Sequence, residues 1–157
     1  MKNMIEMEWK IKSFNQLDRD ELYELLKLRV DVFVVEQNCP YPEIDGKDRH
    51  PETLHLIGLN QNGELLAYLR ILPPGLSFKQ VSIGRVVVGK KSRGQGISDT
   101  MVQKALDHIH LTWPGENVQI GAQVYLKAFY ESHGFGTASE SYLEDGIPHI
   151  DMIRMCS

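Results

Sequence analysis

The sequence is poor in cysteine and contains no long apolar run. Its 157 residues include two cysteines, Cys39 and Cys156. Because Cys156 is the penultimate residue, reduced thiols in a cytoplasmic protein are a simpler interpretation than a structural disulfide. Residues 1–9 are charged and lack an apolar centre, so we expect no signal peptide. No apolar run approaches the roughly 20 residues that span a bilayer, so we expect no membrane partner.

An excess of positive charge is also missing. The formal net charge is -4 at pH 7, whereas nucleic-acid-binding proteins are more often basic, so we expect no nucleic-acid partner. Apolar residues make up 42% of the chain and charged residues 24%, which is typical of an ordinary globular protein. No internal repeat or low-complexity tract divides the sequence, so we expect a single domain over residues 1–157.

Hydrophobic periodicity predicts an alternation of strands and helices. Residues 7–11 alternate between apolar and charged, which predicts a strand. Asp18 and Glu21 have the spacing of a helix N-cap, and apolar residues at helical spacing follow to about Val35. Further strands are expected at 53–59, 65–72, 81–88 and 118–122, further helices at 97–109 and 124–132, and two more strands within 135–155. This order predicts an α/β (α+β) fold with a mixed sheet.

The most informative stretch lies between the strand that ends at Val88 and the helix that begins near Ile97. Gly94 and Gly96 stand in the connecting loop, and a glycine lacks the Cβ that would keep a ligand away from the backbone. Free N–H groups at a helix start, together with the helix dipole, favour an anion. Arg93 adds positive charge beside the loop. The stretch therefore predicts a phosphate-binding site, although two glycines also suit an ordinary tight turn.

Two familiar phosphate-binding motifs do not fit this stretch. A P-loop needs glycine, four residues and then Gly-Lys-Ser/Thr, and the sequence does not contain that pattern. A dinucleotide-binding fingerprint needs a third glycine at the position where Asp99 stands. Both classes of site are therefore excluded here.

Three segments resemble the GNAT superfamily of N-acetyltransferases. Residues 91–96 (KSRGQG) are similar to motif A, usually Gln/Arg-x-x-Gly-x-Gly/Ala, although Lys91 departs from the first position while keeping its positive charge. Residues 122–135 resemble motif B, in which a Phe-Tyr pair precedes a Gly-Phe pair. Residues 28–37 (LRVDVFVVEQ) and the segments that follow them resemble the ElaA-like subgroup. The resemblance extends over nearly the whole chain, from residue 9 to residue 155.

The resemblance implies a GNAT-type fold and an acetyl-CoA site. The fold would be a mixed, mostly antiparallel sheet of six to seven strands flanked by helices, with a splayed V between the fourth and fifth strands. Acetyl-CoA, a cosubstrate, would lie in this V with its thioester carbonyl near the Val86 N–H. The residues implied to bind it are Val86, Val87, Val88, Arg93, Gly94, Gln95, Gly96, Ile97, Ser98, Gln123, Leu126, Phe129 and Tyr130.

For catalysis, the resemblance places an acid at Tyr130, which would protonate the leaving thiolate. A core tyrosine with a satisfied hydroxyl is the alternative. The motifs do not fix the general base. Glu36, His55 and Glu43 are candidates, and loss of the amine proton to water is also sufficient. For His55, an ordinary strand histidine is the interpretation that general experience favours.

The sequence leaves two further features open. Arg85 lies in an apolar strand and needs a partner if it is buried. It would bind an acidic group of the acceptor or, as we favour, pair with Glu36. Residues 38–51 contain acidic residues and a histidine, but their spacing matches no standard zinc or calcium loop. We therefore expect no metal and a solvated, partly ordered loop, which the resemblance places near the acceptor entrance.

These features predict a cytoplasmic N-acetyltransferase. It would move an acetyl group from acetyl-CoA to a primary amine of a small molecule or peptide by direct attack of the amine. A non-catalytic regulatory module that binds CoA is the alternative, and such a module would bind CoA tightly without turnover. Homodimers are frequent among proteins that resemble this one, so a homodimer is a further expectation.

Overall fold

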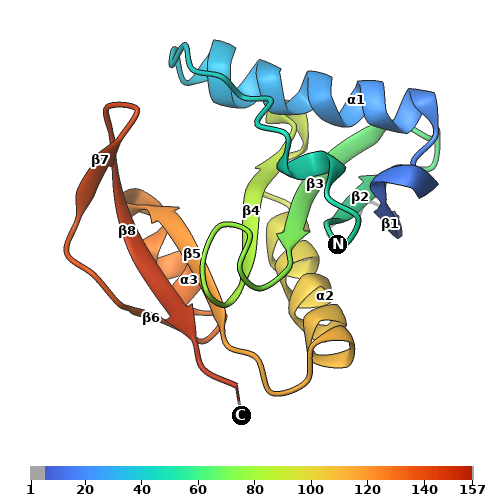
Figure 1. The fold of residues 1–157 in the computed structure, drawn as a ribbon. Coiled ribbons are helices and arrows are strands. Elements are labelled where there is room, and N and C mark those ends of the chain that lie inside the picture. Colours follow the sequence, from blue (N-terminus) through green and yellow to red (C-terminus); the bar gives the residue numbers. More distant parts are fainter. Residues whose placement is uncertain (1–5, 157) are drawn as a thin grey trace.

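The fold is built on one mixed sheet of eight strands (Figure 1). The computed structural model describes residues 6–156. Most of residues 1–9, for which we expected no signal peptide, therefore lies outside the described residues. The strands are β1 (Glu8–Ser13), β2 (Leu54–Leu59), β3 (Leu65–Leu72), β4 (Val81–Val88), β5 (Val118–Gln123), β6 (Phe135–Thr137), β7 (Tyr142–Glu144) and β8 (Ile147–Arg154). The α-helices are α1 (Arg19–Arg29), α2 (Ile97–Thr112) and α3 (Lys127–Glu131). Shorter turns are η1 (Phe14–Gln16), η3 (Lys47–Arg49), η4 (Lys90–Ser92) and η5 (Val124–Leu126), and η2 (Val30–Glu36) is a π-helix.

The strand order is β1-β2-β3-β4-β5-β8-β6, with β7 pairing to β8. The pair β4 and β5 is parallel and the other pairs are antiparallel, which confirms the mixed, mostly antiparallel sheet. The expected count of six to seven strands was too low. The C-terminal tail contributes three strands instead of two, because β6 and β7 both pair with the long β8 at different points along it.

The first helix begins where the sequence predicts it. The Glu21 N–H donates to Asp18 Oδ1 at 2.7 Å, and the Asp18 N–H donates to Glu21 Oε1 at 2.9 Å, which is a complete capping box. The helix expected to continue to about Val35 ends as an α-helix at Arg29 and continues as the π-helix η2. Four of the seven residues in η2 are valines, whose branched side chains lower the preference for a regular α-helix.

The two faces of the N-terminal half of the sheet carry different helices (Figure 1). Successive side chains of a strand point to opposite faces, so Leu56 and Ile57 of β2 serve different cores. Ile57 packs with Leu25 of α1 and with Tyr68 in the smaller apolar cluster. Leu56 belongs to the larger cluster, which includes Met101 and the rest of the apolar face of α2. The site described below lies where β4 leaves this half of the sheet.

The loop between η2 and β2 is held by a buried ion network and is not the solvated loop that we expected. The ion network consists of three arginines and three carboxylates, namely Arg29, Arg70, Arg85, Glu43, Asp45 and Asp48. Arg29, at the end of α1, is 0% exposed. Its Nε donates to Glu43 Oε2 at 2.8 Å and its Nη1 donates to Asp48 Oδ1 at 2.7 Å. The loop therefore closes around the end of α1.

The same loop is tied to two strands of the sheet. Arg70 of β3 donates to Asp45 Oδ2 at 2.6 Å and to Asp48 Oδ1 at 3.1 Å. Arg85 of β4 donates to Glu43 Oε2 at 2.7 Å. One loop consequently links the end of α1, the middle of β3 and the part of β4 that faces the site.

The charges of the ion network balance, which makes their burial tolerable. Burial alone would lower the pKa of Arg29, but the hydrogen bond and charge of Asp48 outweigh it and raise that pKa. Burial would likewise raise the pKa of Asp48, yet Arg29 and Arg70 hold it below its usual range. A buried charge that loses its partner is strongly destabilising, so removing one member of the ion network costs far more than breaking a surface ion pair.

We expect Arg29→Met to destabilise the protein by about 3–5 kcal/mol, because it leaves Glu43 and Asp48 without their shared cation. The matched control is Lys27→Met, which removes an exposed lysine paired with Asp31 one turn away and leaves stability nearly unchanged. Urea denaturation with linear extrapolation measures both variants. If both variants lost the same free energy of unfolding, the burial of Arg29 would not be the cause of the destabilisation.

Candidate functional site

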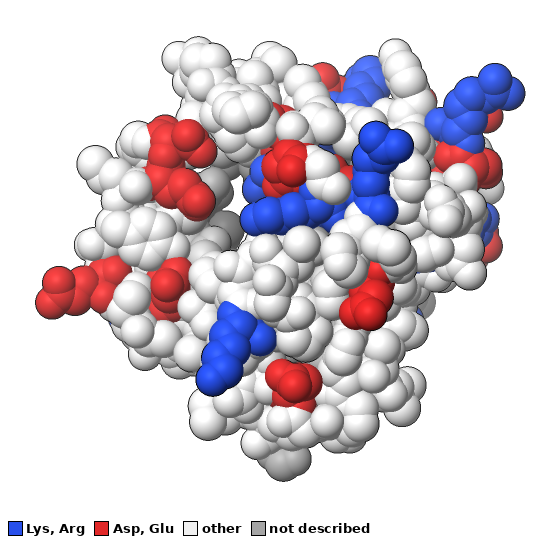
Figure 2. Space-filling view, in the orientation of Figure 1, with Lys and Arg blue, Asp and Glu red and all other residues white. Residues whose placement is uncertain are grey.

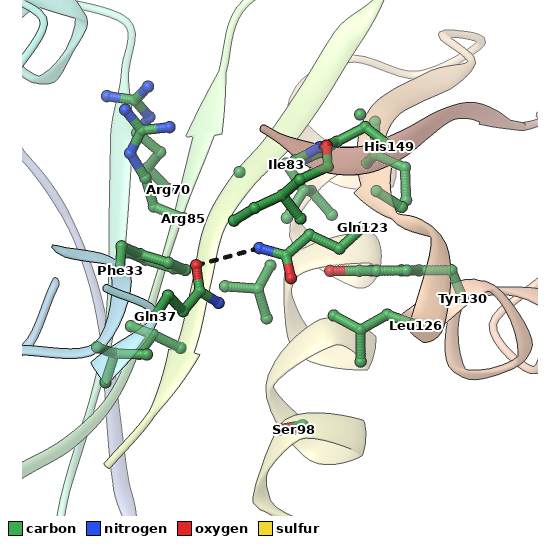
Figure 3. Close-up of a pocket in the computed structure, with 18 of the residues that line it drawn as sticks. Phe33, Gln37, Arg70, Ile83, Arg85, Ser98, Gln123, Leu126, Tyr130 and His149 are labelled. Carbon is green, nitrogen blue, oxygen red and sulfur yellow. Dashed lines mark hydrogen bonds between the residues drawn. The ribbon is translucent and has the colours of Figure 1, made fainter. Parts of the chain in front are cut away.

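Strands β4 and β5 form the two arms of an open V. They share only two register positions, Val81 with Val118 and Ser82 with Gln119. Beyond these positions each strand continues without pairing to the other. A cleft of about 1080 Å³ opens between the arms (Figure 3). The V that the resemblance implies between the fourth and fifth strands is therefore present.

A β-bulge in β4 sets the direction of its cleft-facing residues. In the register between β3 and β4, Arg85 and Val86 together face a single residue of β3. Arg85 has a φ of 53°, in the left-handed region that costs a non-glycine residue roughly 1–3 kcal/mol. Its ion pair with Glu43 and its position over the Tyr41 ring, 5.8 Å from the centroid, hold it there. A bulge leaves its extra residue outside the ladder, so this part of the β4 backbone is not fully paired with β3.

The loop before α2 presents backbone amides to the cleft. Gly94 and Gly96 have φ values of 78° and 77°, which L side chains rarely adopt. No atom lies within 4 Å of the position that a Cβ would take at either glycine, so the space beside the backbone is open. The 16-residue helix α2 begins immediately afterwards at Ile97, and Ile97 and Ser98 both line the cleft. An anion in this space would meet the free N–H groups of the helix start.

Arg93 in this loop is held by Glu36. Its Nη1 and Nη2 donate to the two carboxylate oxygens at 2.6 and 2.9 Å, while its Nε donates to the Val88 carbonyl at 3.1 Å. The hydrogen bond from Arg93 lowers the pKa of Glu36. The pairing of Glu36 with Arg85 that we favoured was therefore wrong. Arg85 binds Glu43 and Asp45 instead, both of which belong to the loop between η2 and β2.

Tyr130 points its hydroxyl into the cleft from α3 (Figure 3). Its ring packs edge-on against Phe129 and Phe135, with centroid distances of 5.0 and 5.8 Å, and the residue is 6% exposed. The hydroxyl makes no hydrogen bond within residues 6–156. Burial raises the pKa of Tyr130, so the hydroxyl keeps its proton at neutral pH. It is a proton donor without a protein acceptor.

The cleft brings together all but one of the residues that the resemblance assigns to the donor. Gln95 does not line the cleft. The others that do so, besides Tyr130, are Val86, Val87, Val88, Arg93, Gly94, Gly96, Ile97, Ser98, Gln123, Leu126 and Phe129. These residues come from β4, the glycine loop, the start of α2, the end of β5 and the segment that includes α3. Their roles remain predictions.

Several charged side chains also line the cleft. Figure 2 shows basic side chains gathered at the centre of this face, beside acidic ones, and further acidic side chains on the side of β7 and β8. Arg85 is neutralised within the ion network, whereas Lys47 donates to a serine hydroxyl. The wall formed by β7, β8 and their turn carries Glu144, Asp145 and Asp151. This wall therefore favours a cationic group over an anionic one.

Two contacts span the open end of the V. The Gln123 side-chain amide, at the end of β5, donates to Gln37 Oε1 at 3.4 Å (Figure 3). Cys39 Sγ donates to the backbone carbonyl of Asp145, in the turn between β7 and β8, at 3.3 Å. Cys39 forms no disulfide and is a buried contact between the segment after η2 and the turn between β7 and β8. The segment after η2 forms a bridge over the cleft.

Two candidates for the general base lie outside the cleft. His55 is 0% exposed and its Nε2 donates to the Asp48 carbonyl at 3.0 Å, while its Nδ1 accepts from the Tyr68 hydroxyl at 2.7 Å. Burial lowers the pKa of His55, so it is a neutral support of the ion network. Glu43 is 4% exposed and is bound by two arginines. Neither side chain can reach an acceptor in the cleft.

Sequence reasoning did not single out His149, which lines the cleft from β8 beside Gln123 of β5 (Figure 3). The signal was the alternation of polar His149 and Asp151 with apolar Ile150 and Met152, which sends one polar face of β8 toward the V.

Within residues 6–156, no group of three or more His, Cys, Asp or Glu side chains is arranged to hold a metal ion. No helix that the structure describes has the length and apolar character needed to cross a bilayer.

Comparisons with known proteins agree on one family. Residues 29–156 match the family model for the acetyltransferase (GNAT) domain. The chain is 45% identical over 148 residues to the ElaA protein of Escherichia coli strain K12, covering 94% of this chain and 96% of that protein. The crystal structure of Escherichia coli ElaA is similar, with a TM-score of 0.89 and 44% identity, covering 95% of this chain and 99% of that one.

Two further solved structures are similar to this chain. A crystal structure of an acyl-CoA N-acyltransferase from Pseudomonas aeruginosa has a TM-score of 0.90 and 46% identity, covering 95% of this chain and 99% of that one. An aminoglycoside 6'-N-acetyltransferase complexed with coenzyme A shares the fold at 14% identity. Its TM-score is 0.67, and the match covers 93% of this chain and 96% of that one.

We expect Glu36→Gln to tighten the binding of inorganic pyrophosphate severalfold, because it removes the anion that occupies Arg93. The control is Glu24→Gln, which removes the same charge from an exposed position on α1. Calorimetric titration at one fixed salt concentration compares the two variants with the unmodified protein. If both variants gained the same affinity, the change would reflect net charge and not the release of Arg93.

Proposed function

This chain belongs to the GNAT acetyltransferase family, and on that premise we propose that it transfers an acetyl group from acetyl-CoA to a primary amine. The observation that carries the proposal is one continuous cleft with a glycine loop at one end and the unpartnered Tyr130 hydroxyl inside it. We also propose that residues 1–157 act as one N-acetyltransferase domain in the cytoplasm. The acceptor amine is not identified by the residues of the cleft.

The donor half of the cleft would bind CoA through the backbone. The N–H groups of residues 93–98 would hold its pyrophosphate, and the positive φ of Gly94 and Gly96 keeps side chains out of that space. Val86, Val87 and Val88 would offer their backbone groups to the pantetheine amides in the manner of an added strand. Gln123 lines the same path and can hydrogen-bond there, while Leu126 and Phe129 supply apolar contacts.

The bulge at Arg85 gives the proposal an electrostatic basis. It takes part of β4 out of the β3 ladder and so frees a backbone donor on the cleft side. The Val86 N–H would then stabilise the negative charge that develops on the thioester oxygen during attack. A donor fixed by the fold needs no reorganisation at the moment of reaction, and the ion network keeps Arg85, and with it the bulge, in place.

Tyr130 would act as the acid that protonates the departing thiolate. It is neutral because burial raises its pKa, and no group within residues 6–156 accepts a hydrogen bond from it. A thiolate is a stronger base in a buried, apolar setting than in water, which makes a neutral phenol a suitable donor. Glu36, which we considered as a base, instead would regulate the charge of Arg93, since the two side chains form a bidentate pair.

Titration with acetyl-CoA tests the donor site. We expect the unmodified protein to bind it and Gly96→Asp to lose at least a tenfold factor in affinity, because a carboxylate would occupy the place of the pyrophosphate. Gly63→Asp is the matched control, since Gly63 has the same φ of 77° and open space but lies in the remote turn between β2 and β3. Absence of binding to the unmodified protein would overturn the proposed function.

Turnover tests the role of Tyr130. We expect Tyr130→Phe to lower kcat by about 100-fold while leaving the affinity for acetyl-CoA nearly unchanged, since only the proton donor is removed. Thiol release with spermidine, phenethylamine and a lysine-containing dipeptide as acceptors gives the measurement. Full turnover in the variant would remove Tyr130 from the acid role. Tight binding of acetyl-CoA with no turnover on any amine would favour the regulatory module instead.

A further inference from the structure

Among the described residues that line the cleft, His149 is the one imidazole. It lies on β8, directly opposite Gln123 of β5 in the sheet register, and is 8% exposed. In the close-up it stands on the side of the pocket that also carries Tyr130, across from Arg85 (Figure 3). Imidazole is the side chain best suited to take up and release a proton near neutral pH. The proposed function leaves this residue without a role.

The hydrogen bonds of His149 fix its tautomer. Its Nδ1 lies 2.7 Å from the backbone carbonyl of Ile147. A carbonyl only accepts hydrogen bonds, so Nδ1 carries the proton and the neutral ring has its lone pair on Nε2. Nε2 makes no hydrogen bond within residues 6–156. The atom left free is thus the one that can accept a proton.

One carboxylate faces Nε2, and two others lie on the strands and turn beside it. Glu144 of β7 has Oε2 at 3.4 Å from Nε2, which is longer than an ordinary hydrogen bond and leaves Nε2 open to another partner. The Tyr142 ring of β7 stacks on the imidazole at 6.1 Å and donates its hydroxyl to Asp151 of β8. Asp145 lies in the turn between the strands. The neighbour from β5 is the neutral Gln123, and Tyr130 is the nearest titratable group that α3 contributes to the cleft.

Glu144 also connects the ring to solvent. Its side chain is 60% exposed, whereas the side chain of His149 is 11% exposed. A proton taken up by the buried ring can therefore be handed to an exposed carboxylate and from there to water. The imidazole, its backbone anchor and this carboxylate follow the arrangement in which a second group orients a base and a third stabilises its charged form.

We propose that His149 is the general base of the acetyl transfer, with the Ile147 carbonyl and Glu144 as positioning groups; this rests on the proposed function. As the amine nitrogen forms a bond to the thioester carbon, His149 Nε2 takes one proton from that nitrogen. The C–S bond then breaks, its electron pair stays on sulfur, and Tyr130 gives its proton to the sulfur. The imidazolium releases its proton to water through Glu144, and the Tyr130 oxygen regains one from water. An amine and a thioester thus yield an amide and a thiol.

The tautomer can be tested without any acceptor. A long-range proton–nitrogen correlation spectrum of the 15N-labelled protein, assigned with the His149→Gln variant, reports which ring nitrogen carries the proton. We expect the Nδ1–H form for His149. The Nε2–H form, which is the usual preference of a free imidazole, would overturn the proposal.

Kinetics test the role itself. We expect His149→Gln to lower kcat/KM by about 100-fold or more and to change its dependence on pH, with unchanged affinity for acetyl-CoA. Spermidine, phenethylamine and water are the acceptors measured. His110→Gln, on the exposed side of α2, is the control and keeps full activity. Glu144→Gln, at an exposed position that does not threaten folding, should lower kcat severalfold.

The outcomes separate this proposal from the proposed function. If the unmodified protein does not bind acetyl-CoA, the proposed function fails, and the assignment of His149 as base fails with it whatever its tautomer. If acetyl-CoA binds and amines are acetylated but His149→Gln retains full turnover and an unchanged pH profile, only the assignment of His149 is overturned.

Discussion

The burial of Arg29 is the constraint on which the site depends. A guanidinium at the end of α1 that is closed off from solvent requires carboxylates around it, and the chain supplies them from one loop, through Glu43 and Asp48. The same loop binds Arg70 of β3 and Arg85 of β4, so the helix end, the loop and two strands take one fixed arrangement. A hydrophobic core would hold these elements together equally well. The charged contacts also fix the relative orientation of these elements, because a guanidinium donates hydrogen bonds to carboxylates in few geometries.

Arg85 connects the ion network to the cleft, because it belongs to the network and also lines the cleft. Its left-handed backbone conformation is unfavourable by itself and persists because Glu43 and Tyr41 fix the side chain. The bulge that results interrupts the β3–β4 ladder at Arg85 and Val86, shortly after β4 has parted from β5 at Ser82. Structural stability and the placement of a backbone donor thus rest on the same contacts. The Tyr130 hydroxyl of α3, across the cleft, has no hydrogen-bond partner among residues 6–156, which leaves it available to a ligand.

Features that depend on neighbouring residues were predictable from the sequence, and features that depend on distant partners were not. A few consecutive residues are enough to predict the capping box of Asp18 and Glu21 and the glycine loop before α2. The structure contains both features. The V follows from family resemblance, since no local pattern specifies where two strands part. The partners of Arg85 lie about 40 residues away in the chain, so charge alone did not distinguish Glu43 from Glu36. His149 escaped notice for a similar reason, because its importance comes from strands that meet only in the folded sheet.

The two bridging contacts over the V have a mechanical consequence. At its narrow end the V is closed by the shared register of β4 and β5, and at its wide end by the Gln37–Gln123 and Cys39–Asp145 contacts. Among the described residues, the gap is thus bounded by contacts at both of its ends. Under the proposed function, CoA would enter this gap from one face and the amine would reach the same point from the opposite face. Both reactants would then occupy the gap together, as the proposed direct attack requires, without a covalent acyl-protein intermediate.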